Sequence, residues 1–406
     1  MKLLRIPRSQ VRLGLALPWN VRDDTGTLLL SKGYLVVDQK QLDELLVRGA
    51  FVDECEARAA AAEAAAARML ISGGDPAKSV GKEFSLFDLW DRTTETLKAL
   101  LANPASEPDF PGRLQAFAQH LLELFDSNPD IAIYRAVRQD NAQNFYYGYT
   151  HAVLTAMTCI LISRHLGWSQ AAILSLVKAA LTMNMTILEL QGQMAAQDHP
   201  PRDKQRAALK VHPVQARELL ERNGVTDVAW LDAVSQHHEH GDGSGYPTGC
   251  TEIGEMAAVL RVADVVMAKI APRTLHQAVT PKDAIAQLYR DDKGGPLSAA
   301  VVKVLGVHPP GDCVKLASGE LGIVLQRTAN SRTPIVACIT DRSGNPVAHT
   351  ERRDTAQAGF AIVATVNDKT MLKRLAPERL YGFVTMLSTQ AAAVPGSSPS
   401  TKVQAA

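Results

Sequence analysis

The sequence predicts a mainly α-helical protein with a small β-rich module at its N-terminal end and a small β appendage near its C-terminal end. Apolar residues recur at helical spacing in almost every segment from Phe84 to Leu305. On both sides of that region the pattern changes to alternation broken by Gly-containing turns, which is typical of strands. The chain has 406 residues, a length greater than one hydrophobic core usually covers, so we expect two or three domains. Hydrophobic residues make up 46% of the chain, which is enough to form such cores.

Residues 1–55 are predicted to form a β-rich accessory or sensory module. Its expected strands lie at 13–19, 28–30 and 34–37. A short helix should close the module, because Asp38 with Gln41 three residues later forms a capping-box pattern and Gly49 is a typical helix stop. Residues 56–76 are rich in Ala, with little to pack, and end in Gly and Pro, so we expect a semi-rigid helical linker.

Residues 77–307 are predicted to form a helical domain. Its first two helices are marked by Leu86 to Leu101 and by Leu114 to Phe125. Further helices are expected at 151–166, 170–190, 212–223, 228–239, 253–269 and 281–289.

Alternating apolar residues return after Pro309-Pro310-Gly311 and predict a small β subdomain over 308–370. Residues 371–390 are taken as a C-terminal segment. The last stretch, 391–406, contains Ala, Pro, Ser and Gly without core-forming residues, so we expect it to be disordered.

Charge and cysteine content exclude several classes of protein. A net charge of +1 gives no general attraction to nucleic acid or to an anionic membrane. The five cysteines are scattered and odd in number, which argues against a disulfide framework or a thiolate zinc site. The longest apolar run, 152–163, is too short to cross a bilayer, and no signal peptide is recognisable. We therefore expect a cytoplasmic protein that binds neither nucleic acid nor membranes.

The run from His237 to Pro247 reads HHEHGDGSGYP and combines two adjacent imidazoles, two carboxylates and a Tyr-Pro flanked by glycine. Neutral imidazoles and carboxylates are ligands for iron, manganese and zinc. A single His at such a place is more often a surface or core residue, but several potential ligands follow one order along the chain. The candidate metal ligands are His151, His212, His237, His238 and Asp264.

These residues resemble those of the HD-GYP domain family, a bacterial branch of the HD phosphohydrolases that hydrolyses the second messenger cyclic di-GMP. The family's loop pattern HHExxDGxGYP is matched at every specified position from His237 to Pro247. His151, His212-Pro213 and Asp264 are similar to the family's other ligand positions. The resemblance covers roughly residues 147–305 and implies an HD-type helical bundle with a divalent metal, iron or manganese in the family.

The resemblance also implies a ligand-gripping surface. Arg273 matches the arginine that holds the nucleotide phosphate, and Tyr246 is placed to stack on a guanine. Gly243 and Gly245 permit a close approach of the backbone, and Pro247 completes the motif. Diguanylate cyclase (GGDEF) domains are partners of the family, so this loop is also a candidate surface for such a protein.

The chain departs from the family at its name-giving dyad. The family's His-Asp pair and its downstream Lys are replaced by Met183, Asn184 and Ile187. The dyad aspartate bridges two metals in the family, whereas Asn184 is uncharged and the Met183 thioether is a poor ligand for hard divalent ions. We therefore expect one metal ion or none, and no fully functional catalytic set.

Two functions follow from this combination. The first is a signalling module that binds cyclic di-GMP or a partner protein, with little or no phosphodiesterase activity. The alternative is an active cyclic di-GMP phosphodiesterase that tolerates the altered dyad. Metal content and hydrolysis of cyclic di-GMP distinguish the two.

Overall fold

The computed structural model describes residues 3–6, 17, 19–32, 34, 50–56, 84–138, 146–275, 279–366, 377–382 and 384. The chain divides into two compact units, Met1–Glu83 and Phe84–Ala406. The predicted helix at 38–49 and the predicted disordered tail at 391–406 lie outside the described residues, as does the predicted linker except for Glu56.

The N-terminal unit contains a four-stranded antiparallel sheet in the order β1-β4-β2-β3. Its strands are β1 (Leu3–Arg5), β2 (Val21–Arg22), β3 (Leu28–Leu30) and β4 (Phe51–Asp53). Trp19, Val21 and Val52 are buried in its small core. The predicted strand at 28–30 is confirmed, whereas β1, β2 and β4 were not predicted. The strands predicted at 13–19 and 34–37 lie mostly outside the described residues.

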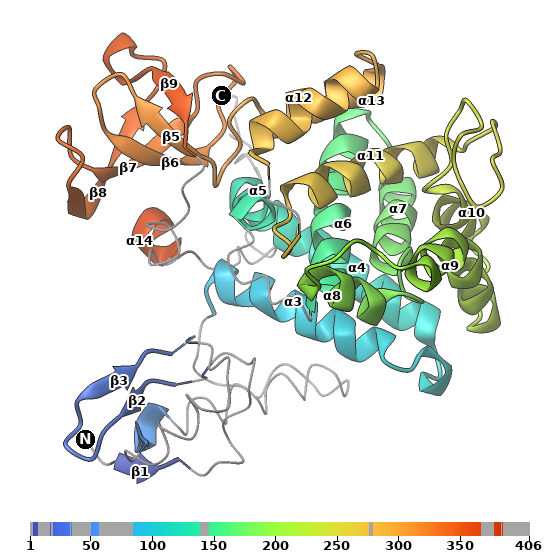
Figure 1. Cartoon of the computed structure of the whole chain (residues 1–406), viewed down its shortest axis with the longest axis horizontal. Helices are drawn as coiled ribbons and strands as arrows, with labels where there is room; N and C mark the ends of the chain where they lie inside the picture. The colour runs from blue at the N-terminus through green and yellow to red at the C-terminus, as the bar shows by residue number, and fades with distance from the viewer. Residues whose placement is uncertain are drawn as a thin grey trace, which may run out of the picture. The chain divides into compact units, whose positions relative to one another are not determined.

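The second unit is mainly helical, as predicted (Figure 1). Its first helices are α3 (Leu86–Leu101), α4 (Phe110–Ser127), α5 (Pro129–Arg138), α6 (Tyr147–His165), α7 (Gln170–Thr182) and α8 (Leu188–Ala196). They are followed by α9 (Asp203–Arg222), α10 (Val228–Gln236), α11 (Glu255–Ile270), α12 (Pro281–Asp291) and α13 (Pro296–Leu305). Helices α5 and α13 were not predicted from the sequence.

Helix α6 lies at the centre of the bundle and packs against α7, α11, α8 and α13. Nearly all of its side chains are buried, which follows from apolar residues on every face. The helix therefore carries His151 into the interior, where α11 brings Asp264 to meet it.

Several predicted helices have different bounds in the structure, and three of the differences concern the candidate site. The predicted helix at 228–239 ends at Gln236, so His237 and His238 lie just beyond it. The predicted helix at 170–190 is two helices, α7 and α8, separated by a turn at 183–187. The predicted helix at 212–223 begins earlier, at Asp203, so His212 lies inside α9 and not at its start. Periodicity alone missed the break because three of the five turn residues, Met183, Met185 and Ile187, are apolar and continue the apolar pattern of the helices.

The C-terminal part of this unit forms a five-stranded antiparallel sheet in the order β8-β7-β6-β5-β9. Its strands are β5 (Cys313–Leu316), β6 (Leu321–Gln326), β7 (Ile335–Thr340), β8 (Pro346–Asp354) and β9 (Ile362–Thr365), and a short helix, α14 (Pro377–Tyr381), follows. Ile323 and Leu325 of β6 belong to the same buried cluster as the helices, so the sheet and the bundle share a core. The predicted class, mainly α with a small β region at each end, is confirmed.

Among the described residues no helix combines the length and the apolar character needed to span a bilayer.

Candidate metal centre and ligand-binding loop

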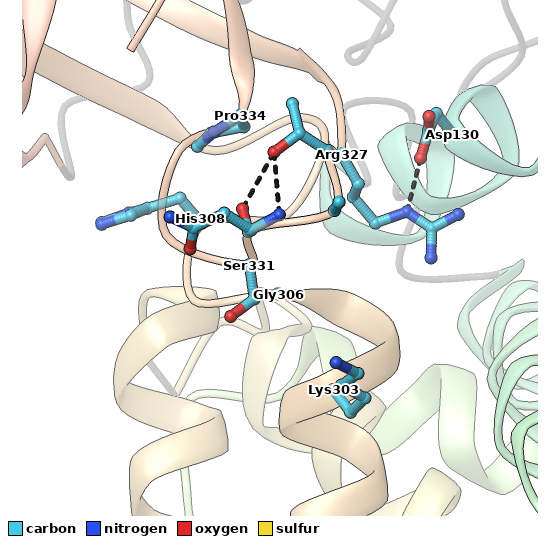
Figure 2. Close-up of a pocket in the computed structure, with 10 residues that line it drawn as sticks. Asp130, Lys303, Gly306, His308, Arg327, Ser331 and Pro334 are labelled. Atoms are coloured by element: carbon cyan, nitrogen blue, oxygen red, sulfur yellow. Dashed lines mark hydrogen bonds and ion pairs between the residues drawn. The ribbon is translucent and has the colours of Figure 1, made fainter. Parts of the chain in front are cut away.

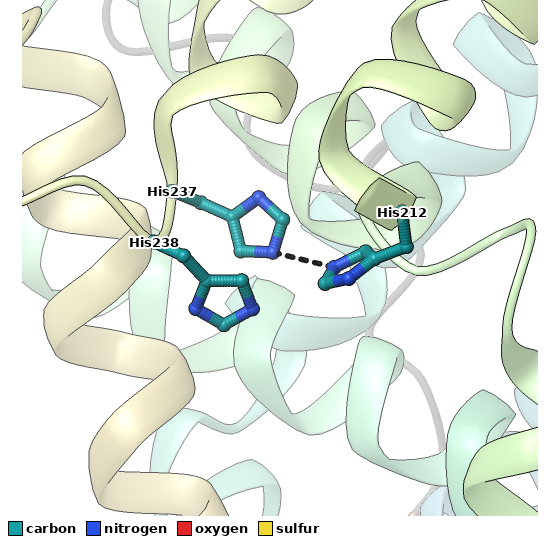
Figure 3. A group of neighbouring side chains, drawn as sticks. All are labelled: His212, His237 and His238. Atoms are coloured by element: carbon teal, nitrogen blue, oxygen red, sulfur yellow. Dashed lines mark hydrogen bonds between the residues drawn. The ribbon is translucent and has the colours of Figure 1, made fainter. Parts of the chain in front are cut away.

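Three histidines from two helices meet in the interior of the bundle (Figure 3). His212 projects from α9, and His237 and His238 follow directly at the end of α10. One ligand atom from each ring lies within 4.8 Å of the others. His212 and His237 are completely buried, so these imidazoles contact each other and not bulk water.

Hydrogen bonds to the backbone fix the orientation of two of these rings. Nδ1 of His212 lies 2.7 Å from the carbonyl oxygen of Leu209, and Nδ1 of His237 lies 2.7 Å from that of Val234. A carbonyl only accepts, so each Nδ1 carries the proton and each Nε2 presents a lone pair. The two Nε2 atoms lie 3.2 Å apart, as the dashed line in Figure 3 marks, and this contact brings together two acceptors that a shared cation would satisfy.

The spacing of these nitrogens fits one metal ion. With metal–nitrogen bonds of about 2.0–2.1 Å in a tetrahedral arrangement, two imidazole nitrogens on one ion are about 3.3–3.4 Å apart. The separation of 3.2 Å between His212 Nε2 and His237 Nε2 is close to that value. Backbone carbonyls that hold Nδ1 of ligand histidines are the usual support for such sites.

All three imidazoles are held in the neutral form that binds metals. Burial, together with the neighbouring His238, lowers the pKa of His212 to about 4. Burial also lowers the pKa of His237 well below its ordinary value, with contributions from His238 and His212, and burial lowers the pKa of His238. The cluster therefore offers unprotonated nitrogens at pH 7.

The other two predicted ligands, His151 and Asp264, contact each other directly. His151 Nε2 lies 2.6 Å from Asp264 Oδ1, and both residues are buried. Burial opposes the charge on Asp264, but the hydrogen bond with His151 and the attraction of His151, His238 and His237 lower its pKa. The carboxylate thus stays ionised beside the three-histidine cluster.

A tyrosine that the sequence analysis did not single out stacks on this pair. The ring of Tyr147 lies parallel to that of His151, with 5.6 Å between the ring centroids. Burial raises the pKa of Tyr147 to about 12, so its phenol stays neutral. Its position one helical turn before His151 on α6 is the sequence signal that could have found it.

The turn between α7 and α8 contains Met183, Asn184 and Ile187, the three positions at which the sequence analysis predicts a departure from the HD-GYP pattern. Met183, Asn184 and Ile187 are 0%, 3% and 4% exposed. Met183 belongs to the main hydrophobic core cluster. The turn borders the histidine cluster, since Thr186 Oγ1 lies 3.4 Å from the carbonyl oxygen of His212. No anionic oxygen is available at these three positions.

The loop after His238 folds back on the histidines. The Tyr246 ring stacks on the His238 ring at 4.6 Å between centroids, and the Tyr246 N–H donates to the carbonyl oxygen of His238 at 3.2 Å. Gly243 has a φ of +75°, which favours glycine. A Cβ on Gly245 would meet three backbone or Cα atoms of residues 238–240 at 2.4–2.6 Å, so only glycine fits there. Pro247 follows Tyr246 through a cis peptide bond.

The loop is also held by a glutamate inside the motif. Glu239 is 1% exposed, and its Oε1 accepts hydrogen bonds from the Thr248 N–H and hydroxyl, each at 2.7 Å. Asp242 is different, because its carboxylate only accepts from Ser244 within an exposed turn. Glu239 and Asp242 therefore shape the loop and do not join the histidine cluster.

Arg273 follows α11 and lies over the ring of Tyr147, with its guanidinium carbon 5.9 Å from the ring centroid. Nη2 donates to the carbonyl oxygen of Ala268 at 3.3 Å, and Nε is buried without a partner among the described residues. The sequence-predicted phosphate contact is thus placed next to Tyr147, on the His151 side of the cluster.

Comparison with known proteins finds similarity over part of the chain. Residues 128–294 match the family model described as HD domain. The chain is 27% identical over 190 residues to the cyclic di-GMP phosphodiesterase PA4108 of Pseudomonas aeruginosa, and the match covers 46% of each protein.

A second relative is the cyclic di-GMP phosphodiesterase response regulator RpfG of Xanthomonas campestris pv. campestris. It is 31% identical over 150 residues, which is 35% of this chain and 39% of the relative. The chain thus matches less than half the length of both curated relatives. Among solved structures, Bd1817, an HDG"Y"P protein from Bdellovibrio bacteriovorus, is similar with a TM-score of 0.46 and 16% identity, over 74% of this chain and 97% of that one.

Proposed function

We propose that the helical domain binds cyclic di-GMP and hydrolyses it slowly or not at all. The observation that carries this proposal is the buried turn at 183–187, where Met183, Asn184 and Ile187 provide no anionic oxygen beside an otherwise well-formed cluster of histidines. Two curated relatives are named cyclic di-GMP phosphodiesterases, which supports the choice of nucleotide.

The side chains that would hold the nucleotide are Arg273, Tyr246 and the loop glycines. Arg273 would donate to a phosphate oxygen through the N–H groups not used by Ala268, and charge-assisted bonds of this type are strong. Tyr246 would offer its ring to a guanine from the face opposite His238. Gly243 and Gly245 would let the ligand approach the backbone.

His212, His237 and His238 would hold one divalent ion. A bound ion at this place would polarise a phosphoryl oxygen as a Lewis acid. The donor set fits a single ion, because three neutral nitrogens converge within 4.8 Å. The place of a second ion retains only His151 and Asp264, which hydrogen-bond to each other at 2.6 Å. Asn184 supplies no charge to bridge two ions.

The loss at the dyad predicts a large drop in rate. Removing one electrostatic contribution to a transition state typically costs about 3 kcal/mol, or roughly a hundredfold in rate. Replacement of His, Asp and Lys by Met183, Asn184 and Ile187 removes more than one such contribution.

A second candidate function is a phosphodiesterase that works with the altered dyad. The three neutral imidazoles and the ionised Asp264 favour it, because a single ion with open coordination sites could still support hydrolysis. Binding of a GGDEF-domain protein through the 237–247 loop stays a prediction, and a pull-down with such a domain, compared between wild type and Tyr246→Ala, tests it.

The decisive experiment is a titration of the full chain with cyclic di-GMP, with and without manganese, alongside metal analysis and a hydrolysis assay. The proposal expects saturable binding that weakens in Arg273→Gln, at most one equivalent of metal, and turnover at least a hundredfold below that of an active relative. Two equivalents of iron or manganese with rapid formation of the linear dinucleotide would establish the phosphodiesterase instead.

Restoring the dyad provides a second, independent measurement. The triple variant Met183→His, Asn184→Asp, Ile187→Lys should raise the metal content of the purified protein. Continued absence of a second ion would mean that the cavity around residue 184 cannot accommodate two ions, and the proposed cause of inactivity would be wrong.

A further inference from the structure

A cavity of about 450 Å³ lies between the helices and the C-terminal sheet, well separated in sequence from the histidine cluster (Figure 2). Its walls come from the start of α5, the end of α13 and the loop between β6 and β7. The volume is within the range of small-molecule sites. The polar side chains that line it are Asp130, Lys303, His308, Arg327, Asn330 and Ser331.

The lining carries two permanent positive charges and one negative charge. Lys303 is exposed and, within the described part of the chain, makes no ion pair or hydrogen bond. The carboxylate of Asp130 accepts from Arg327 Nε at 2.6 Å, so its charge is already compensated. The remaining charge at the cavity is the positive charge of Lys303, which favours an anion.

Arg327 is held in place before any ligand arrives. Its Nε is bound to Asp130, and its Nη1 donates to the carbonyl oxygen of Val304 at 2.5 Å. Nη2 forms no hydrogen bond to a described residue. A guanidinium fixed at two nitrogens loses little freedom when the third binds an oxyanion.

The loop that forms the opposite wall is also fixed. The Thr328 Oγ1 lies 3.0 Å from the carbonyl oxygen of Asn330 and 2.9 Å from that of Thr333, so the two carbonyls share its one O–H donor, and the Asn330 N–H donates to the same oxygen at 3.3 Å. The Ser331 carbonyl accepts from the Val307 N–H at 3.1 Å, which joins the loop to the end of α13. Ser331 thus lines the cavity from a loop held by these hydrogen bonds.

His308 closes a further side of the cavity. Its Nδ1 lies 3.2 Å from Asp312 Oδ2, and a carboxylate accepts, so Nδ1 carries the proton and Nε2 is left as an acceptor in the neutral ring. The cavity therefore combines cationic donors at Lys303 and Arg327 with Nε2 of His308, which accepts a hydrogen bond when the ring carries only its Nδ1 proton.

We propose that this cavity binds a small phosphate ester, with the phosphate between Lys303 and Arg327 and a hydroxyl-bearing group towards His308. A free phosphate ion occupies on the order of 100 Å³, if each heavy atom takes a volume comparable to a water molecule. The cavity is several times larger, so an organic group of the size of a sugar fits beside the phosphate. The site is separate from the proposed function of the histidine cluster.

The test uses the full chain and isothermal titration with three probes: inorganic phosphate, ribose 5-phosphate and uncharged ribose. We expect saturable binding of ribose 5-phosphate, weaker binding of phosphate and no binding of ribose. Lys303→Gln should weaken binding of the two phosphates roughly tenfold, because one charge-assisted hydrogen bond is lost. Ser331→Ala should weaken it less. Lys315→Gln, which removes another exposed lysine, on β5, is the matched control and should change nothing.

The same titrations with the double variant His237→Ala/His238→Ala distinguish the two sites, because this variant should still bind ribose 5-phosphate at the cavity. Equal affinity for inorganic phosphate and ribose 5-phosphate would mean that the cavity binds free phosphate, and the proposed phosphate ester would be wrong. Binding that is absent up to millimolar concentration, or that is the same in wild type and Lys303→Gln, would overturn the proposal.

Discussion

Replacing Gly245 by alanine should break the link between the 237–247 loop and the histidine cluster. The added Cβ would lie 2.4 Å from the His240 nitrogen, 2.5 Å from Glu239 Cα and 2.6 Å from the His238 carbonyl oxygen. All three neighbours belong to the backbone, which cannot rotate away as a flexible side chain would. One of the two loop segments, either the one with Gly245 or residues 238–240, must therefore move by about 1 Å in a closely packed region.

The expected cost of Gly245→Ala is about 1–3 kcal/mol of unfolding free energy, the usual range for overpacking. Gly241→Ala is the matched control, because it lies in the same loop and its Cβ would have no atom within 4 Å. That control should stay within about 0.5 kcal/mol of wild type. Denaturant unfolding of the two variants measures this difference directly.

The shift should also reach the metal ligands. The Tyr246 N–H donates to the His238 carbonyl oxygen, and the Tyr246 ring stacks on His238, so a displaced Gly245 moves the third imidazole. We expect weaker metal binding in Gly245→Ala and unchanged binding in Gly241→Ala. Equal stability and equal metal affinity of the two variants would refute the close packing on which the argument rests.

Three further predictions concern the same interior. His237→Ala with His238→Ala should abolish binding of the single metal ion, measured by metal analysis after dialysis; an ion that stays bound would place the site elsewhere. The pKa values of the three buried histidines are lowered in the folded protein, that of His212 to about 4. As the pH falls from 7 towards 5, these histidines therefore bind protons in the unfolded chain but stay neutral in the folded protein. Stability of the metal-free protein should then fall by up to about 1.4 kcal/mol per pH unit for each such histidine, and His212→Gln should reduce the slope of denaturant stability against pH. Thr182→Val removes the acceptor of the buried Trp230 Nε1, 2.9 Å away, and should cost about 1–3 kcal/mol in thermal or denaturant unfolding; a cost near zero would mean that the indole finds another partner.

The helical class could be predicted because most helices of the bundle bury one apolar face, and such a face leaves a period in the sequence. The break after Thr182 could not, because Met183 and Ile187 are as apolar as the helices they separate. The β1 and β4 strands were missed for another reason: they pair with each other across nearly the whole N-terminal unit, and pairing between distant residues has no local signature.

The candidate ligands could be chosen from the sequence because imidazoles and carboxylates in a recognisable order are rare. Which of these ligands lie close together could not be predicted from the sequence. Only the packing of α9 against α10 brings His212 within reach of His237, and only the packing of α6 against α11 joins His151 to Asp264. Tyr147 was not predicted, because its role depends on a ring contact made after α6 is buried.

The sequence by itself determined the helical class, the set of candidate metal ligands and the absence of a carboxylate at residue 184. Only the tertiary structure decided which histidine nitrogens face one another. It also formed the cavity lined by Lys303 and Arg327, which no sequence motif indicates. The physical reason is that residue types fix the available charges and donors, whereas distances between them depend on packing of segments far apart in the chain.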